Sequence, residues 1–136
     1  MRFSAELSSR AIPVLNSTAC VVVIDDDTEF RDSLGRLLRS AGLQPRLFAS
    51  IADFLESEPA DSPTCLVLDV RLPGRSGLDF QRDLAAASVR LPIVFITGHG
   101  DIPMSVKAMK AGAIEFLTKP FDDAILLEIV HAAVEN

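Results

Sequence analysis

The sequence has no apolar run long enough to cross a membrane. The longest, from Ala19 to Ile24, has six residues, whereas a bilayer requires about 20. The opening segment, residues 1–18, contains two arginines but no continuous apolar stretch of the kind found in a signal peptide. We therefore expect a cytoplasmic protein that does not enter the membrane, and we interpret residues 1–18 as a poorly ordered extension.

Cysteine is also scarce, and basic residues are outnumbered by acidic ones. Cys20 and Cys65 are the two cysteines, and each begins an apolar run, so buried core thiols are expected rather than a disulfide or a metal site. The chain has 13 lysines and arginines against 19 acidic residues, a formal charge of -6, which disfavours a nucleic-acid surface on this domain. Its 136 residues, 49% of them hydrophobic, fit one globular domain, which we place at residues 19–136.

Five short apolar runs recur along the chain. Three of them are continuously apolar rather than alternating, as in strands that are buried on both faces of a parallel sheet. The runs occupy residues 20–24, 45–49, 65–70, 92–96 and 113–117.

Segments with helical spacing separate these runs. Asp27 and Thr28 are placed to cap the first helix, and Gly42 to end it. Asp101 and Gly112 are placed in the same way around the fourth helix. Alternating strands and helices predict a single α/β domain with a doubly wound (βα)5 parallel sheet. The apolar helical positions are Phe30, Leu34, Leu37, Leu38 and Ala41; a weaker set within residues 50–57; Leu78, Leu84 and Ala85; Met104, Val106 and Met109, for which core packing is the default; and Leu126, Ile129, Val130 and Ala133.

Polar side chains follow four of the five predicted strands. Asp25 and Asp26 come after the first strand, Asp69 lies at the end of the third, Thr97 follows the fourth and Lys119 follows the fifth. The carboxyl ends of parallel strands lie along one edge of the sheet, where ligands bind. Strand order therefore predicts that three carboxylates, a hydroxyl and an ammonium group share one pocket.

Such a cluster of acids is unstable without a cation. Two carboxylates ~4 Å apart repel by about 4 kcal/mol at an effective dielectric constant of about 20, and one lysine cannot offset three acids. Oxygen ligands without histidine or cysteine favour Mg²⁺ or a similar hard ion. A hard cation, a lysine and a hydroxyl around one free carboxylate indicate phosphoryl transfer to that carboxylate.

Three stretches together carry a family resemblance: VVVIDDD, LVLDVRLPGRSGLD and FITGHGDIPMSVKAMKAGAIEFLTKPF. They resemble the receiver domain of two-component response regulators, in the FixJ/NarL-like branch, over about residues 19–136. The resemblance implies a flavodoxin-like sheet with strand order 2-1-3-4-5. It also implies a signalling switch that phosphorylates and dephosphorylates itself, rather than an enzyme that turns over a separate substrate.

The resemblance implies roles for the acidic residues. Asp69 would accept the phosphoryl group. Asp26 would bind Mg²⁺ directly, Asp25 would act largely through a water molecule, and Asp69 and the backbone carbonyl of Arg71 would complete the protein ligands. The Arg71 side chain would affect the lifetime of the phosphoryl group.

It also implies roles for the residues that follow the last two strands. Thr97 would hydrogen-bond a phosphoryl oxygen, Lys119 would pair with the phosphoryl group, and Phe116 would turn inward on activation. His99 would affect phosphoryl lifetime. The bond between Lys119 and Pro120 is usually cis in this family.

The partners implied are a sensor histidine kinase and a second copy of the chain. Phosphorylation would create a homodimer through the fourth helix, the fifth strand and the fifth helix. FixJ-like receivers normally precede a DNA-binding helix-turn-helix domain, and none follows the final HAAVEN here. We therefore expect a fragment of a longer transcription regulator that reaches DNA only through that missing domain.

Two other classes of protein compete with this interpretation. A Mg²⁺-dependent haloacid-dehalogenase-type phosphatase would use Asp25 as its nucleophile. That motif requires a threonine where Glu29 stands, expects Asp122 and Asp123 to end a strand rather than open a helix, and leaves Asp69 unexplained. A binding module that is never phosphorylated would have no need of the complete polar set.

Overall fold

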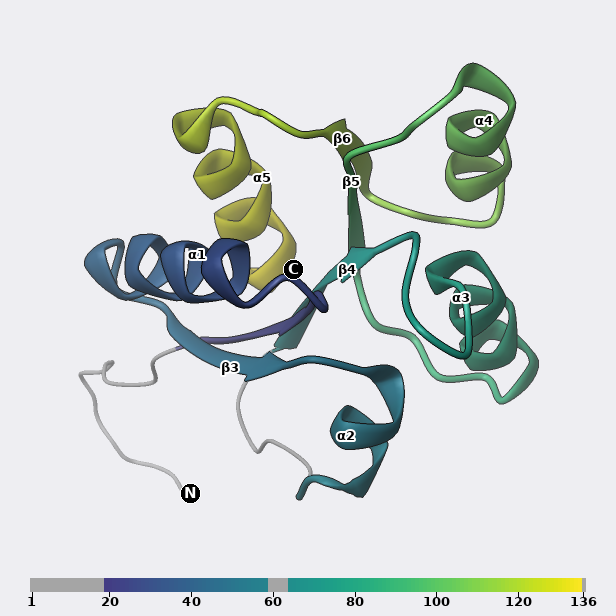
Figure 1. Ribbon diagram of the computed structural model, residues 1–136, viewed down its shortest axis with the longest axis horizontal. Coiled ribbons are helices and arrows are strands. Elements are labelled where there is room, and N and C mark those ends of the chain that lie inside the picture. The colour runs from purple at the N-terminus through teal and green to yellow at the C-terminus, as the bar shows by residue number, and fades with distance from the viewer. Residues whose placement is uncertain (1–18, 59–63, 136) are drawn as a thin grey trace.

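The centre of the computed structural model, which describes residues 19–58 and 64–135, is a five-stranded parallel sheet (Figure 1). Its order is β3-β2-β4-β5-β6, which is 2-1-3-4-5 when the strands are counted along the chain. The expected doubly wound, flavodoxin-like architecture is confirmed, whereas the predicted extension at residues 1–18 lies outside the described residues. The strands are β2 (Cys20–Ile24), β3 (Gln44–Phe48), β4 (Thr64–Asp69), β5 (Ile93–Thr97) and β6 (Glu115–Thr118).

Helices cover both faces of the sheet, with α1 and α5 on one face and α2, α3 and α4 on the other (Figure 1). This arrangement explains why the central strands read as continuous apolar runs. Every residue of β2 is buried, and Val21 and Val23 pack under α1 and α5 while Cys20, Val22 and Ile24 face the opposite layer. The helices are α1 (Thr28–Ser40), α2 (Ile51–Glu56), α3 (Gly77–Ala86), α4 (Ile102–Lys110) and α5 (Asp123–Glu135).

The predicted helix signals are mostly confirmed. The Asp27 carboxylate accepts the Phe30 N–H at 3.1 Å and caps α1, but Thr28 is the first helical residue rather than part of the cap. Asp101 caps α4 in the same way. Gly112 follows that helix with a φ of 105°, a conformation that residues with a Cβ rarely adopt.

The buried side of α3 differs from the prediction. Leu78 and Leu84 are only partly buried and Ala85 is exposed, whereas Phe80 and Gln81 lie in the interior. Gln81 is tolerated there because its Nε2 donates to the backbone oxygen of Ala108 at 3.0 Å. Polar residues with such a partner are invisible to a pattern of apolar spacing.

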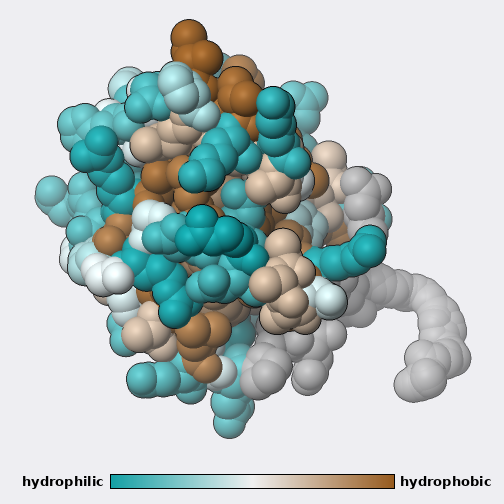
Figure 2. Space-filling view, turned by 90° about the vertical axis from the view of Figure 1, so that its right-hand side faces the viewer, coloured by the Kyte–Doolittle hydropathy of each residue, from teal (hydrophilic) through white to brown (hydrophobic). Residues whose placement is uncertain are grey.

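The apolar residues of α4 also differ in burial. Met104 packs against the core, but Val106 and Met109 are exposed, so the default of core packing is wrong for these two. Figure 2 views the side of the molecule that carries α3 and α4, and it shows exposed hydrophobic groups at its top, at the height of α4. Val106 and Met109 of α4 therefore face solvent.

Cys20 and Cys65 are confirmed as buried free thiols. They belong to the core layers on opposite faces of the sheet, and burial raises the pKa of the Cys65 thiol to about 12. Among the residues that the structure describes, no helix is long and apolar enough to span a bilayer.

Candidate functional site

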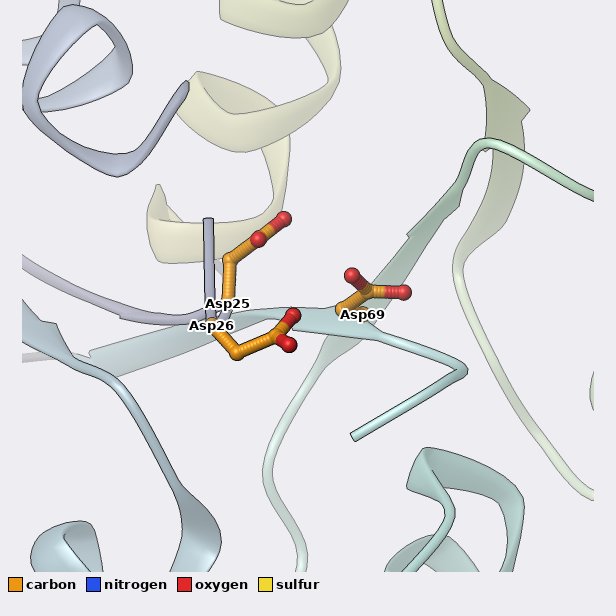
Figure 3. Close-up of side chains that lie close together, drawn as sticks. All are labelled: Asp25, Asp26 and Asp69. Atoms are coloured by element: carbon orange, nitrogen blue, oxygen red, sulfur yellow. The ribbon is translucent and has the colours of Figure 1, made fainter. Parts of the chain in front are cut away.

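The three predicted carboxylates meet at the carboxyl edge of the sheet (Figure 3). Asp25 and Asp26 directly follow β2, and Asp69 is the last residue of the neighbouring strand β4. Each contributes an oxygen to a group whose ligand atoms all lie within 4.8 Å of one another. We call these three residues the acid cluster; its donors, all carboxylate oxygens, suit a hard divalent cation.

Asp25 is the most enclosed member of the acid cluster, with none of its surface exposed. Its Oδ1 accepts the Asp27 N–H at 2.8 Å, and its Oδ2 accepts a hydrogen bond from Lys119 Nζ at 2.8 Å. Asp26, in contrast, is exposed. A buried carboxylate without partners would be strongly destabilising, so the ion pair with Lys119 compensates the burial of Asp25.

Asp69 is also buried, but its carboxylate lies farther from the Lys119 ammonium group than that of Asp25 does. It is 6% exposed, its Oδ1 accepts the Arg71 N–H at 3.0 Å, and its Oδ2 lies 3.7 Å from Lys119 Nζ. Burial raises the pKa of the Asp69 carboxyl to about 6, and repulsion from Asp25 and Asp26 adds to the rise, while the Arg71 amide and Lys119 oppose it. The site therefore holds more negative charge than its single lysine offsets.

Thr97 and Lys119 join the ends of β5 and β6 to this site. The Lys119 N–H donates to the Thr97 backbone oxygen at 2.8 Å, and the Thr97 hydroxyl, 1% exposed, accepts the His99 N–H at 3.1 Å. The bond between Lys119 and Pro120 is cis, as the family resemblance implied. The five polar residues predicted from the strand ends thus lie along one edge of the sheet.

Phe116 lies next to this edge, on β6. Its ring packs on that of Phe95 with centroids 6.2 Å apart, and it is partly buried. The loop from β5 to α4 passes close by, because a Cβ on Gly100 would lie 2.9 Å from Thr118 Cγ2 and 3.0 Å from both Phe116 Cε1 and Thr97 Cγ2. A larger residue at position 100 would have to displace one of these side chains.

Arg71 and His99 are at the rim. Both are exposed, and each is held through its backbone N–H, Arg71 by the Asp69 carboxylate and His99 by the Thr97 hydroxyl. Their side chains are therefore free to reach solvent beside the acid cluster.

The sequence did not predict that two further residues, Gly77 and Phe30, would lie next to the site. A Cβ on Gly77, the first residue of α3, would collide with the backbone oxygen of Asp69, so glycine here lets the helix approach the strand end. The Phe30 ring lies against Lys119, with Nζ 4.0 Å from its centroid. The second glycine in LPGRSG and the aromatic residue in the first helical turn after the three aspartates were the available signals.

Comparison with known proteins agrees with this geometry. Residues 21–131 match the model of the response regulator receiver domain. Nodulation protein W of Bradyrhizobium diazoefficiens is 54% identical over 121 residues, which is 89% of this chain and 53% of that protein. Transcriptional regulatory protein FixJ of the same organism is 45% identical over 116 residues, 85% of this chain and 57% of that protein.

A solved structure of the response regulator StyR superposes with a TM-score of 0.79 at 50% identity, covering 87% of this chain and 60% of that one. The chain spans about half the length of the curated relatives it matches. The haloacid-dehalogenase reading gains no support from these relatives, and both oxygens of Asp25, its required nucleophile, are already engaged. The chain belongs to the family of response regulator receiver domains, the signalling modules of two-component systems.

Proposed function

We propose that this chain is a phosphorylation-controlled switch that takes a phosphoryl group from a sensor histidine kinase onto Asp69, in the cytoplasm. The observation that carries the proposal is the convergence of Asp25, Asp26 and Asp69 with Lys119 at one sheet edge. Receiver domains as a family accept phosphoryl groups from histidine kinases, and the family assignment supports the same reaction here.

Mg²⁺ is the proposed cofactor. The three carboxylates of the acid cluster and the backbone carbonyl of Arg71 would hold it, because oxygen donors and an uncompensated negative charge suit a small hard cation. When bound, the ion would neutralise charge on the phosphoryl oxygens. The pKa of Asp69 is consistent with this assignment: burial raises it most, and repulsion from the Asp25 and Asp26 carboxylates, which a cation would relieve, raises it further.

The chemical step is the attack of a carboxylate oxygen of Asp69 on phosphorus. The P–N bond of the phosphohistidine breaks, its electron pair stays on the imidazole nitrogen, and an acyl phosphate forms on Asp69. With a pKa of about 6 the carboxyl is mostly ionised near neutral pH, and burial keeps it a stronger base than an exposed aspartate. Lys119, 3.7 Å from Asp69 Oδ2, is close enough to pair with the incoming phosphoryl oxygens.

The switch is proposed to run through Thr97 and Phe116. The Thr97 hydroxyl would turn from the His99 amide toward the phosphoryl group, and Phe116 would move inward behind it. Such a change shifts the population between two arrangements of the loop after β5. The exposed side chains of Arg71 and His99 would set how readily water reaches the acyl phosphate.

The proposed output is a homodimer formed through α4, β6 and α5. Several apolar side chains on or beside these elements are exposed, and a second copy of the chain packed on this side would cover them. They are Ile102, Val106, Met109, Ile114 and Ile125.

We propose that the receiver, residues 19–136, acts on transcription through a DNA-binding helix-turn-helix domain that would follow it in a longer regulator. Support comes from the name of the FixJ relative, a transcriptional regulatory protein, and from the half of the curated relatives' length that this chain does not span.

Labelling with acetyl phosphate tests the proposal. Intact-mass measurement in Mg²⁺ should show one added phosphoryl group, peptide mapping should place it on Asp69, and EDTA should abolish it. Sizing chromatography before and after labelling should show a shift from monomer to dimer. A phosphoryl adduct on the Asp69→Asn variant, or on Asp25, would refute the assignment of the acceptor.

A further inference from the structure

The ammonium group of Lys119 rests on an aromatic ring from the opposite end of the chain. Nζ lies 4.0 Å from the centroid of Phe30, which is in the first turn of α1. The lysine side chain is only 22% exposed. An ammonium group at this distance from the negative face of a ring is attracted electrostatically, and more strongly where water is partly excluded.

The surrounding structure holds that ring in place. Phe121, two residues after Lys119, packs its ring edgewise on Phe30 with centroids 5.9 Å apart and planes at 90°. The Phe30 N–H is itself bound by the capping carboxylate of Asp27. The ring is therefore fixed by the start of α1 and by the segment that carries the lysine.

The ring also limits where the ammonium group can go. Lysine has a flexible four-carbon stem, and Asp25 alone would leave it several ways to form one hydrogen bond. In the structure Nζ has the Asp25 oxygen at 2.8 Å, the Asp69 oxygen at 3.7 Å and the Phe30 face at 4.0 Å. These contacts together keep the cation beside the proposed phosphoryl acceptor.

We propose that Phe30 is a positioning residue that holds Lys119 for phosphoryl transfer by a cation–π contact. The inference rests on the proposed function of Asp69 and Lys119, and it adds a residue that no strand-end motif marks. The alternative is a purely structural role, in which Phe30 only fills space against Phe121 and the core beneath α1. In the first case the position of Lys119 depends on the electrostatic character of the ring face, whereas in the second it depends only on the volume of the ring.

A series of fluorinated phenylalanines at position 30 separates them. Mono-, di- and trifluorination progressively weaken the negative face of the ring while nearly preserving its shape. The rate of Mg²⁺-dependent labelling by acetyl phosphate should fall stepwise, by about fivefold over the series, given about 1 kcal/mol for a partly buried contact. Phe30→Trp should keep the rate near that of the wild type, whereas Phe30→Leu should lower it.

Phe48 provides the matched control. Its ring also faces a cation, Arg46 at 5.5 Å, and packs edgewise on Phe54, but it does not contact Lys119. The same fluorinated series at Phe48 should leave the labelling rate unchanged. A flat response at Phe30, with normal labelling of Asp69, would overturn the inference and leave the proposed function intact.

A second measurement does not depend on phosphorylation. Urea unfolding of the wild type, Phe30→Leu, Lys119→Met and the double variant in metal-free buffer gives the coupling between ring and cation. The unfolding constants should be non-additive by about fivefold. Additive effects would contradict the contact even if Asp69 proved not to be phosphorylated.

Discussion

Replacing Asp69 by asparagine should stabilise the metal-free protein at about pH 7.5, although it removes the proposed phosphoryl acceptor. Asparagine has nearly the same shape and keeps an oxygen that can accept the Arg71 N–H. It lacks the negative charge that is buried beside Asp25 and Asp26. The gain therefore measures the free energy lost when Asp69 ionises in its buried position, with repulsion from Asp25 and Asp26 as a smaller part of it.

The size of the effect follows from the pKa. The Asp69 pKa rises from 3.8 to about 6 on folding, and each unit of pKa corresponds to about 1.4 kcal/mol, so ionisation of Asp69 destabilises the folded state by about 3 kcal/mol. Because the folded pKa is the higher one, wild-type stability is lost as the pH rises from about 4 to about 6. Asparagine does not titrate, so its advantage should appear over the same interval.

Urea unfolding in EDTA across that pH range is the appropriate assay. The two proteins should have nearly equal free energies of unfolding at about pH 4 and should differ by about 3 kcal/mol above about pH 7. Saturating Mg²⁺ should reduce or reverse the difference at neutral pH, since the ion would stabilise the wild-type site more. A variant that is less stable than the wild type in EDTA at neutral pH would refute the electrostatic reasoning.

Two further predictions concern the same edge of the sheet. Gly77→Ala should destabilise the fold by about 2 kcal/mol or more and abolish labelling of Asp69, because the new methyl group would collide with the Asp69 backbone oxygen. Thermal melts and mass spectrometry would test this. Gly98→Ala is the neutral control, because a Cβ at position 98 meets nothing within 4 Å. Asp26→Ala should weaken Mg²⁺ binding, measured by calorimetry. In metal-free buffer it should raise the melting temperature by relieving repulsion within the acid cluster. An unchanged Mg²⁺ affinity would contradict the proposed role of Asp26 as a ligand.

The strands and most helix ends could be predicted because their causes are local. Continuous apolar runs require cover on both faces, and Asp27, Asp101 and Gly112 supply caps and a positive φ within a few residues of the ends that they form. The predicted strand ends differ from the observed ones by up to two residues: β6 begins at Glu115 rather than at residue 113. The buried Gln81 was missed because its partner, Ala108, lies on another helix.

The site could be predicted as a set of residues but not as a set of contacts. Parallel strands with helical crossovers necessarily bring their carboxyl ends to one edge, and that rule alone gathers Asp25, Asp69 and Lys119. It does not say which acid the lysine binds. In the structure Lys119 is 2.8 Å from Asp25 and 3.7 Å from Asp69, a choice made by side-chain conformation and burial.

The order of apolar and polar residues by itself therefore determined the strands, the helices between them and the sheet edge at which the charges gather, since each depends on periodicity and on the geometry of strand crossovers. The order of the strands within the sheet came from the family resemblance. Only the tertiary structure decided how the charges are shared, because Asp25 and Lys119 are 94 positions apart. The Phe30 ring beneath the lysine has the same origin. Contacts between distant segments depend on how whole elements pack, and no local pattern encodes that.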